Sequence, residues 1–97
     1  MLLKLGVSVT DLKREIRRAL PVIDLCFIKT LGGEAVITST NEGSHSPGSL
    51  HYANLAVDVR LTGGYGRVLP VLRERLGPGF DVVEEKDHLH IEYDPKP

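Results

Sequence analysis

Two short segments alternate apolar and polar residues, and this alternation constrains the fold more than any other feature. Residues 55–61 place an apolar residue at every second position, namely Leu55, Val57, Val59 and Leu61. Residues 88–93 repeat the pattern with Leu89, Ile91 and Tyr93. Because successive side chains of a strand point to opposite faces of a sheet, each segment predicts a strand with one buried and one polar face. Asp58, His88 and His90 would share the polar face if the two strands lie close together.

The N-terminal third of the chain predicts helices. Ser8 and Asp11 resemble a capping box, which would start a helix near Val9. The apolar face of this helix repeats at four-residue spacing, with Leu12, Ile16 and Leu20. Pro21 ends the helix or starts a second one, because proline is tolerated in a first helical turn. The second helix is apolar nearly all round, so we expect it to be buried until the glycine pair at 32–33 stops it.

The remaining elements complete an α+β pattern. Further strands are predicted at residues 34–40 and 80–85, and a short helix is predicted from Val68 to Leu76. A tight turn at Lys86-Asp87 would join the last two strands. We therefore expect one domain, residues 1–97, of the α+β class. Its small, mainly antiparallel sheet would carry the helices on one face and the polar site on the other.

Composition excludes several classes of function. A net charge of −1 argues against a nucleic-acid partner, because phosphate binding relies on clustered basic residues. Basic residues do cluster in the first predicted helix, where their spacing indicates a solvated face: Lys13, Arg14, Arg17 and Arg18. No run approaches the roughly 20 apolar residues of a membrane helix. The N-terminal segment becomes charged too early for a secretory signal, so we expect a chain that is cytoplasmic when synthesised and does not insert into a membrane.

The polar residues near the two alternating segments form a set of metal ligands. A histidine, an aspartate seven residues later and an H-x-H pair make up this set: His51, Asp58, His88 and His90. Three such ligands suit a catalytic zinc ion, whose fourth position stays open to water. Imidazole and carboxylate ligands without thiolates favour zinc, with manganese, nickel or cobalt as alternatives. The set therefore predicts a hydrolase with one zinc ion (Zn²⁺) per chain, on the face of the sheet opposite the helices.

The segment from Ser49 to Asp58 also resembles a family signature. Its residues follow the pattern S-x-H-x-x-N-x-A-x-D, which is similar to the S-x-H-x-x-G-x-A-x-D signature of the M15 metallopeptidases. These are D-Ala-D-Ala carboxypeptidases and phage endolysin endopeptidases, related to lysostaphin-type enzymes and to the hedgehog signalling domain. The resemblance extends from Ile23 to Pro95 and includes the H-x-H motif in the expected order.

By position, the resemblance implies that His51, Asp58 and His90 bind zinc. Asp87, three residues before His90, falls where many members have the catalytic acid of an E-x-x-H motif, and Glu85 is a reserve candidate for this role. The first histidine of H-x-H, His88, would lie near the metal and stabilise the oxyanion.

The expected substrate contacts come from three further residues. Ser49 would support the site, and His45 lies on the loop that would face the cleft or the solvent. Arg60 shares the strand face of Asp58, so it would bind a substrate carboxylate or form a structural ion pair.

Three departures from the family pattern stand out. Asn54 replaces glycine, a mild change because asparagine tolerates a positive φ angle better than other residues with a side chain. Asp87 replaces glutamate and shortens the reach of the general base by one methylene group. No arginine follows shortly after Ser39, where several carboxypeptidases have a substrate-carboxylate binder.

The resemblance implies zinc-dependent hydrolysis of a peptide bond in bacterial cell-wall stem peptides, by a carboxypeptidase or an endopeptidase. The alternative is a zinc-stabilised binding module on the same scaffold without turnover. Release by a lysis system or delivery in a phage particle would bring such a chain to the cell wall. The sequence does not predict the oligomeric state.

Overall fold

The computed structural model describes residues 1–40 and 53–96, and within them five strands form one sheet. The strands lie in the order β1-β2-β3-β5-β4. Their bounds are Leu2–Leu3 for β1, Val36–Ser39 for β2, Ala56–Arg60 for β3, Phe80–Glu84 for β4 and His88–Tyr93 for β5. Only β1 and β2 pair in parallel, and each of the other neighbouring pairs is antiparallel. The expected α+β fold with a mainly antiparallel sheet is confirmed.

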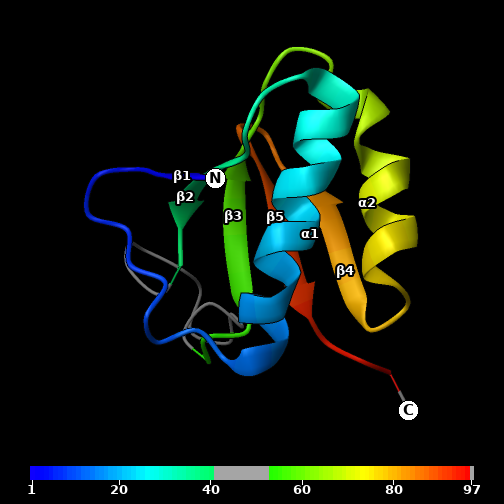
Figure 1. Ribbon diagram of the computed structural model, residues 1–97. Helices are drawn as coiled ribbons and strands as arrows, with labels where there is room; N and C mark the ends of the chain where they lie inside the picture. The colour runs from blue at the N-terminus through cyan, green and yellow to red at the C-terminus, as the bar shows by residue number, and fades with distance from the viewer. Residues whose placement is uncertain (41–52, 97) are drawn as a thin grey trace.

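Two helices lie against one face of this sheet (Figure 1). Helix α1 spans Arg14–Leu31, and helix α2 spans Leu69–Leu76 after the short 3-10 turn η1 at Tyr65–Arg67. The glycine at position 32 ends α1 with a φ of 78°, a conformation that glycine adopts without steric cost. The helices therefore form one layer of the fold and cover one face of the sheet. The opposite face remains for polar side chains.

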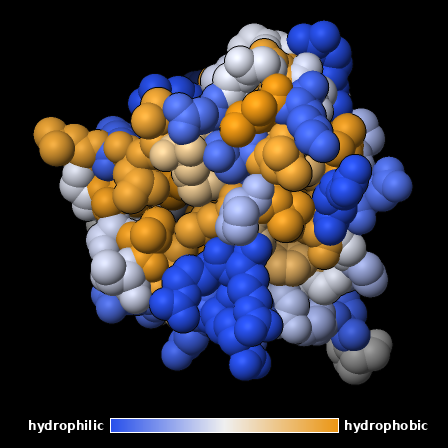
Figure 2. All heavy atoms as spheres, in the orientation of Figure 1, coloured by the Kyte–Doolittle hydropathy of each residue, from blue (hydrophilic) through white to orange (hydrophobic). Residues whose placement is uncertain are grey.

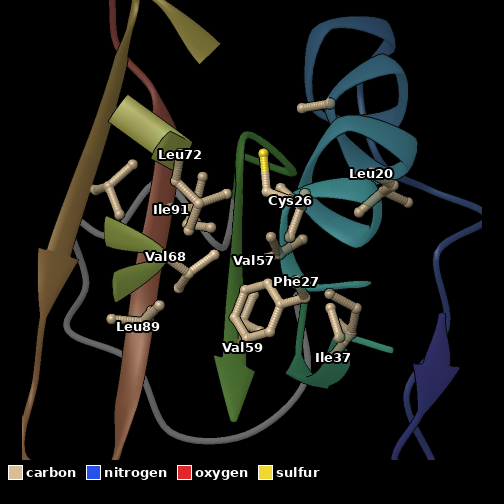
Figure 3. Close-up of a cluster of buried hydrophobic side chains, with 14 of the residues drawn as sticks. Leu20, Cys26, Phe27, Ile37, Val57, Val59, Val68, Leu72, Leu89 and Ile91 are labelled. Atoms are coloured by element: carbon tan, nitrogen blue, oxygen red, sulfur yellow. The ribbon is translucent and has the colours of Figure 1, made fainter. Parts of the chain in front are cut away.

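The hydrophobic core fills the space between the helices and the sheet (Figure 3). Phe27 from α1 and Leu72 from α2 are almost completely buried there. From the sheet, the core takes the apolar residues of the alternating segments: Val57 and Val59 of β3, and Leu89 and Ile91 of β5. All four have no exposed surface. The period-two patterns at residues 55–61 and 88–93 therefore identified the buried faces of both strands.

The prediction of two helices separated at Pro21 was wrong. Helix α1 is continuous through Pro21, and it begins at Arg14 and not near Val9. Ser8 caps no helix, because its Oγ accepts a hydrogen bond from the Thr10 backbone N–H within a local turn. The physical reason is packing, since the apolar residues on both sides of the proline lie on one helical face and are buried together: Ile16, Ala19, Leu20, Ile23, Cys26 and Phe27.

The first strand was not predicted from the sequence. Leu2 and Leu3 pair with Val36 and Ile37, and this pairing extends to a hydrogen bond from the Lys4 N–H to the Ile37 carbonyl. Two residues are too few to show a period-two pattern, and both leucines are exposed. The pairing adds an edge strand and brings Lys4 beside β2.

The outer surface of the helical layer combines hydrophobic and hydrophilic regions (Figure 2). Leu25 and Ile28 of α1 are exposed there. The basic residues near the start of α1 are also exposed, as expected for a solvated face: Lys13, Arg14, Arg17 and Arg18. Among the described residues, no helix combines the length and the apolar character that crossing a membrane requires.

Candidate functional site

Asp58 and His90 form the centre of the candidate site. They are direct partners in the antiparallel pairing of β3 with β5, and both point away from the helices because their neighbours Val57, Val59 and Ile91 fill the core. The Asp58 Oδ1 atom lies 3.2 Å from the His90 Nδ1 atom. Asp58 is buried, with 7% of its surface exposed. The expectation that both residues share one face of adjacent strands is confirmed.

The spacing of these two atoms fits two ligands of one zinc ion. Ligand atoms bonded to tetrahedral zinc at about 2.0–2.2 Å lie roughly 3.3 Å from each other. The Asp58 Oδ1 and His90 Nδ1 atoms have nearly this separation, and carboxylate and imidazole are both ligands that zinc accepts. Two of the three expected ligands, Asp58 and His90, lie among the described residues. The third, His51, lies outside the described residues, as do His45 and Ser49.

Glu92 contacts the second ring nitrogen of His90. The Glu92 Oε1 atom lies 2.6 Å from His90 Nε2, on the side of the ring opposite Asp58. The hydrogen bond with Asp58, followed by that with Glu92, raises the pKa of His90 above its ordinary value, although partial burial opposes this effect. A carboxylate on the second ring nitrogen fixes the orientation of a metal-binding histidine. Because Glu92 contacts Nε2, the Nδ1 atom is the ring nitrogen of His90 that faces Asp58.

The sequence alone suggests that Glu84 and Glu92 are solvated strand acids, and this is confirmed for Glu84, which is exposed, but wrong for Glu92. Glu92 is half-buried and bonded to His90, and Glu84 accepts a hydrogen bond of 2.6 Å from the Tyr65 hydroxyl. The contact of Glu92 with His90 could have been predicted from the sequence, because residues two apart on a strand share a face. It was missed because exposed acids are common on strands, and only the side-chain conformations reveal the contact.

His88 and Asp87 form a second hydrogen-bonded pair beside the first. His88 Nδ1 donates to Asp87 Oδ1 over 2.6 Å, and His88 Nε2 lies 3.5 Å from Asp58 Oδ1. The contact with His88 lowers the pKa of Asp87, whose side chain is 84% exposed. His88 thus links Asp87 in the turn before β5 to Asp58 on β3. Glu85 lies in the same hairpin and is exposed, and its backbone N–H donates to the His88 carbonyl.

Arg60 lies directly across from His88 in the pairing of β3 with β5. It is exposed and contributes to a pocket of about 260 Å³. The described residues that line this pocket are Lys4, Thr38, Arg60, Asp87 and His88. His88 therefore belongs both to this pocket and to the group around Asp58. The position of Lys4 could not be predicted from the sequence, because it depends on the short strand β1.

An acidic cluster on the paired strands β4 and β5 shares Glu92 with the surroundings of His90. Among the described residues it is the one group of three potential metal ligands whose ligand atoms all lie within 4.8 Å of one another: Asp81, Glu92 and Asp94. Its oxygen-only ligands suit calcium or magnesium better than zinc. The Lys96 ammonium group also binds Asp94 and lies 3.5 Å from Asp81, so a cation of the chain already occupies this cluster.

No protein-family model matches the sequence, and searches among curated proteins and solved structures found no match either.

Proposed function

We propose that this chain is a zinc-dependent peptidase that cleaves a peptide bond in the stem peptides of the bacterial cell wall. The observation that carries the proposal is the 3.2 Å approach of Asp58 Oδ1 to His90 Nδ1, with the Asp87–His88 pair beside it. The reaction class rests on this ligand spacing. The substrate class rests on the resemblance of residues 49–58 and of the H-x-H motif to M15 metallopeptidases.

His51, Asp58 and His90 would hold the zinc ion. When bound, zinc would polarise the scissile carbonyl group and acidify a water molecule. The contact of Glu92 with His90 Nε2 supports this assignment, because it keeps Nδ1 directed at Asp58. Glu92 would hold the ring in place and strengthen His90 as a ligand.

Proton transfer is assigned to the Asp87–His88 pair. With its Nδ1 proton donated to Asp87, a neutral His88 has its free electron pair on Nε2, the nitrogen that lies 3.5 Å from Asp58. His88 would take a proton from the attacking water and return it to the leaving amine, while Asp87 orients the ring. The resemblance instead assigns the base role to Asp87 itself, so the two residues need to be tested separately.

The experiment measures metal content and cleavage on the same preparation. Elemental analysis should find about one zinc ion per chain, and mass spectrometry should detect cleavage of stem peptides that contain D-Ala-D-Ala or L-Ala-D-Glu bonds. Wild-type protein without zinc after purification free of chelators would contradict the proposal. Zinc-loaded protein that cleaves neither bond would instead favour the binding module.

Matched variants then separate the roles of the two residues in the pair. His88→Gln should reduce kcat by at least about a hundredfold, because general base catalysis contributes roughly 10²–10⁴ in rate. Asp87→Asn should retain more activity than His88→Gln and shift the pH profile of the reaction. If Asp87→Asn loses as much activity as His88→Gln while zinc content is unchanged, Asp87 itself is the base.

A further inference from the structure

A second pocket lies in the helical layer, where residues of α1 and α2 line it together. Its volume is about 200 Å³, and we call it the helix pocket. Its lining residues are Val22, Leu25, Cys26 and Lys29 of α1, and Val71 and Arg75 of α2. The helices cover one face of the sheet, whereas Asp58 and His90 point away from them. The helix pocket is therefore separate from the candidate metal site.

Most of the lining of the helix pocket is apolar. Val22 and Val71 are partly buried, and Cys26 is buried. Leu25 is 49% exposed, and Ile28, a neighbour three residues later on the helix surface, is 43% exposed. Figure 2 shows exposed hydrophobic surface on this side of the molecule. The apolar surface thus continues from the pocket along α1.

Two cations, Lys29 and Arg75, line the same pocket. Both are exposed, and within residues 1–40 and 53–96 neither forms an ion pair or a side-chain hydrogen bond. Burial raises the pKa of the Cys26 thiol and the charge of Arg75 opposes this effect, so the guanidinium group lies close to the apolar lining. Two such cations beside an apolar surface are complementary to anionic groups on a ligand with an apolar part.

The size of the helix pocket favours a protein segment over a small molecule. Small-molecule sites usually have volumes of about 300–1,000 Å³ and enclose most of the ligand. The helix pocket is smaller, and Ile28 extends the apolar surface outside it. One large apolar side chain would fill the pocket, while neighbouring residues of the same segment would cover Leu25 and Ile28. Anchors of this kind provide most of the binding energy when a peptide lies in a groove between helices.

We propose that the helix pocket is a docking site for a segment of a partner protein, with one large apolar side chain and acidic residues within a helical turn of it. The apolar side chain enters between α1 and α2 and loses its contact with water. Lys29 and Arg75 bind the acidic residues and disfavour basic segments. The docking site uses no residue of the candidate metal site, so this proposal is independent of the peptidase function.

The first test determines which peptides the protein selects. A display library of random peptides is passed over immobilised full-length protein, and peptides that bind wild type but not Leu25→Lys are sequenced. Leu25 is exposed, so the variant should keep its fold, which circular dichroism checks. The retained peptides should combine a large apolar residue with nearby acidic residues. Failure to retain any such peptide, or enrichment of basic or uncharged sequences, would overturn the proposal.

The second test measures the contribution of charge. One selected peptide is labelled, and its Kd is measured by fluorescence anisotropy. Lys29→Gln combined with Arg75→Gln should weaken binding about tenfold, because two partly exposed ion pairs are lost. Arg17→Gln combined with Arg67→Gln removes two exposed cations outside the pocket and is the matched control that should keep the wild-type Kd. An equal loss in both double variants would indicate nonspecific attraction and contradict the assignment.

Three further measurements test other occupants of the helix pocket. Octanoate that binds more tightly than every selected peptide would assign the pocket to a small amphiphile. Phosphatidylglycerol vesicles that bind wild type but not Leu25→Lys would assign it to a lipid surface. Analytical ultracentrifugation that finds a dimer of wild type but not of Leu25→Lys would assign it to a second copy of this chain. We expect none of these results, and each would overturn docking of a partner segment.

Discussion

Asp58 on β3 and His90 on β5 face each other across adjacent strands, with Oδ1 and Nδ1 3.2 Å apart. A buried carboxylate beside an imidazole stabilises a proton on the ring, and a divalent cation can replace that proton because it uses the same two atoms. The proposed zinc binding would therefore be related to protonation of His90 and to folding stability through one pair of residues.

The first prediction concerns stabilisation by zinc. Zinc at about 100 times its dissociation constant should stabilise metal-stripped wild-type protein by about 2.7 kcal/mol. For a domain of this size, that corresponds to a rise in Tm of roughly 10 °C or more. Thermal unfolding followed by circular dichroism measures the shift. Asp58→Asn and His90→Gln should lose most of it.

Asp81→Asn is the control for this experiment, because it alters the acidic cluster of Asp81, Glu92 and Asp94 without touching Asp58 or His90. It should keep the full zinc shift. A shift that disappears in Asp81→Asn and survives in Asp58→Asn would place the ion in the acidic cluster and contradict the assignment.

The second prediction concerns the pH dependence of the metal-free protein. The pKa of His90 in the folded state lies above its ordinary value of 6.5, mainly because of the hydrogen bond with Asp58. The folded state thus binds this proton more tightly than the unfolded state. The stabilisation is fully present below the unfolded pKa and is lost as the pH rises through the folded pKa.

Urea unfolding of wild type and His90→Gln in the presence of a chelator measures this effect, and the difference between the two cancels groups common to both. The difference in free energy of unfolding should be larger near pH 5.5 than near pH 9. Zinc affinity should change in the opposite direction, because protons compete with the metal for His90. A difference in stability that grows with pH would show that His90 is neutral in the folded protein.

The sequence predicted the faces of the two central strands but not how the strands meet. Alternation assigns Asp58 and His90 to the polar face, since side chains repeat every two residues. It does not determine register, and the direct pairing of Asp58 with His90 depends on β5 lying between β3 and β4. Lys4 was beyond prediction for a related reason, because its position depends on pairing by a two-residue strand.

Local signals failed where long-range packing decided the outcome. Pro21 locally predicts a helix boundary, but burial of one apolar face along α1 outweighs the cost of an interior proline. By contrast, the sequence alone indicated the backbone conformation of Asn54. This residue occupies the position of the glycine in the M15 signature, and asparagine tolerates a positive φ angle. Its φ of 61° is the one positive value at a residue other than glycine in the described part of the chain.

The third prediction follows from this conformation of Asn54. Its side-chain oxygen is also buried without a hydrogen-bond partner among the described residues. Both Asn54→Gly and Asn54→Ala remove the oxygen, but only glycine adopts the left-handed conformation without strain. Asn54→Gly should therefore be more stable than Asn54→Ala by about 1 kcal/mol. Chemical denaturation of both variants provides the measurement.

Gly33 is the matched control, because its φ is not in the left-handed region and a Cβ there would meet no atom within 4 Å. Gly33→Ala should leave the stability unchanged or raise it. An alanine at position 54 as stable as glycine would mean that the backbone relaxes out of the positive φ region.

The fourth prediction concerns Pro21 in the interior of α1. Proline lacks the N–H that would bond to the carbonyl of Arg17, and its ring crowds the preceding turn. Pro21→Ala restores this bond at an exposed position, although alanine gives the unfolded chain more freedom. The net effect should be a stabilisation of about 2 kcal/mol, measured by chemical denaturation.

Pro70 lies in the first turn of α2, where no intrahelical bond is lost, so Pro70→Ala should bring no gain. Destabilisation by Pro21→Ala would show that the ring shapes α1 to fit the sheet.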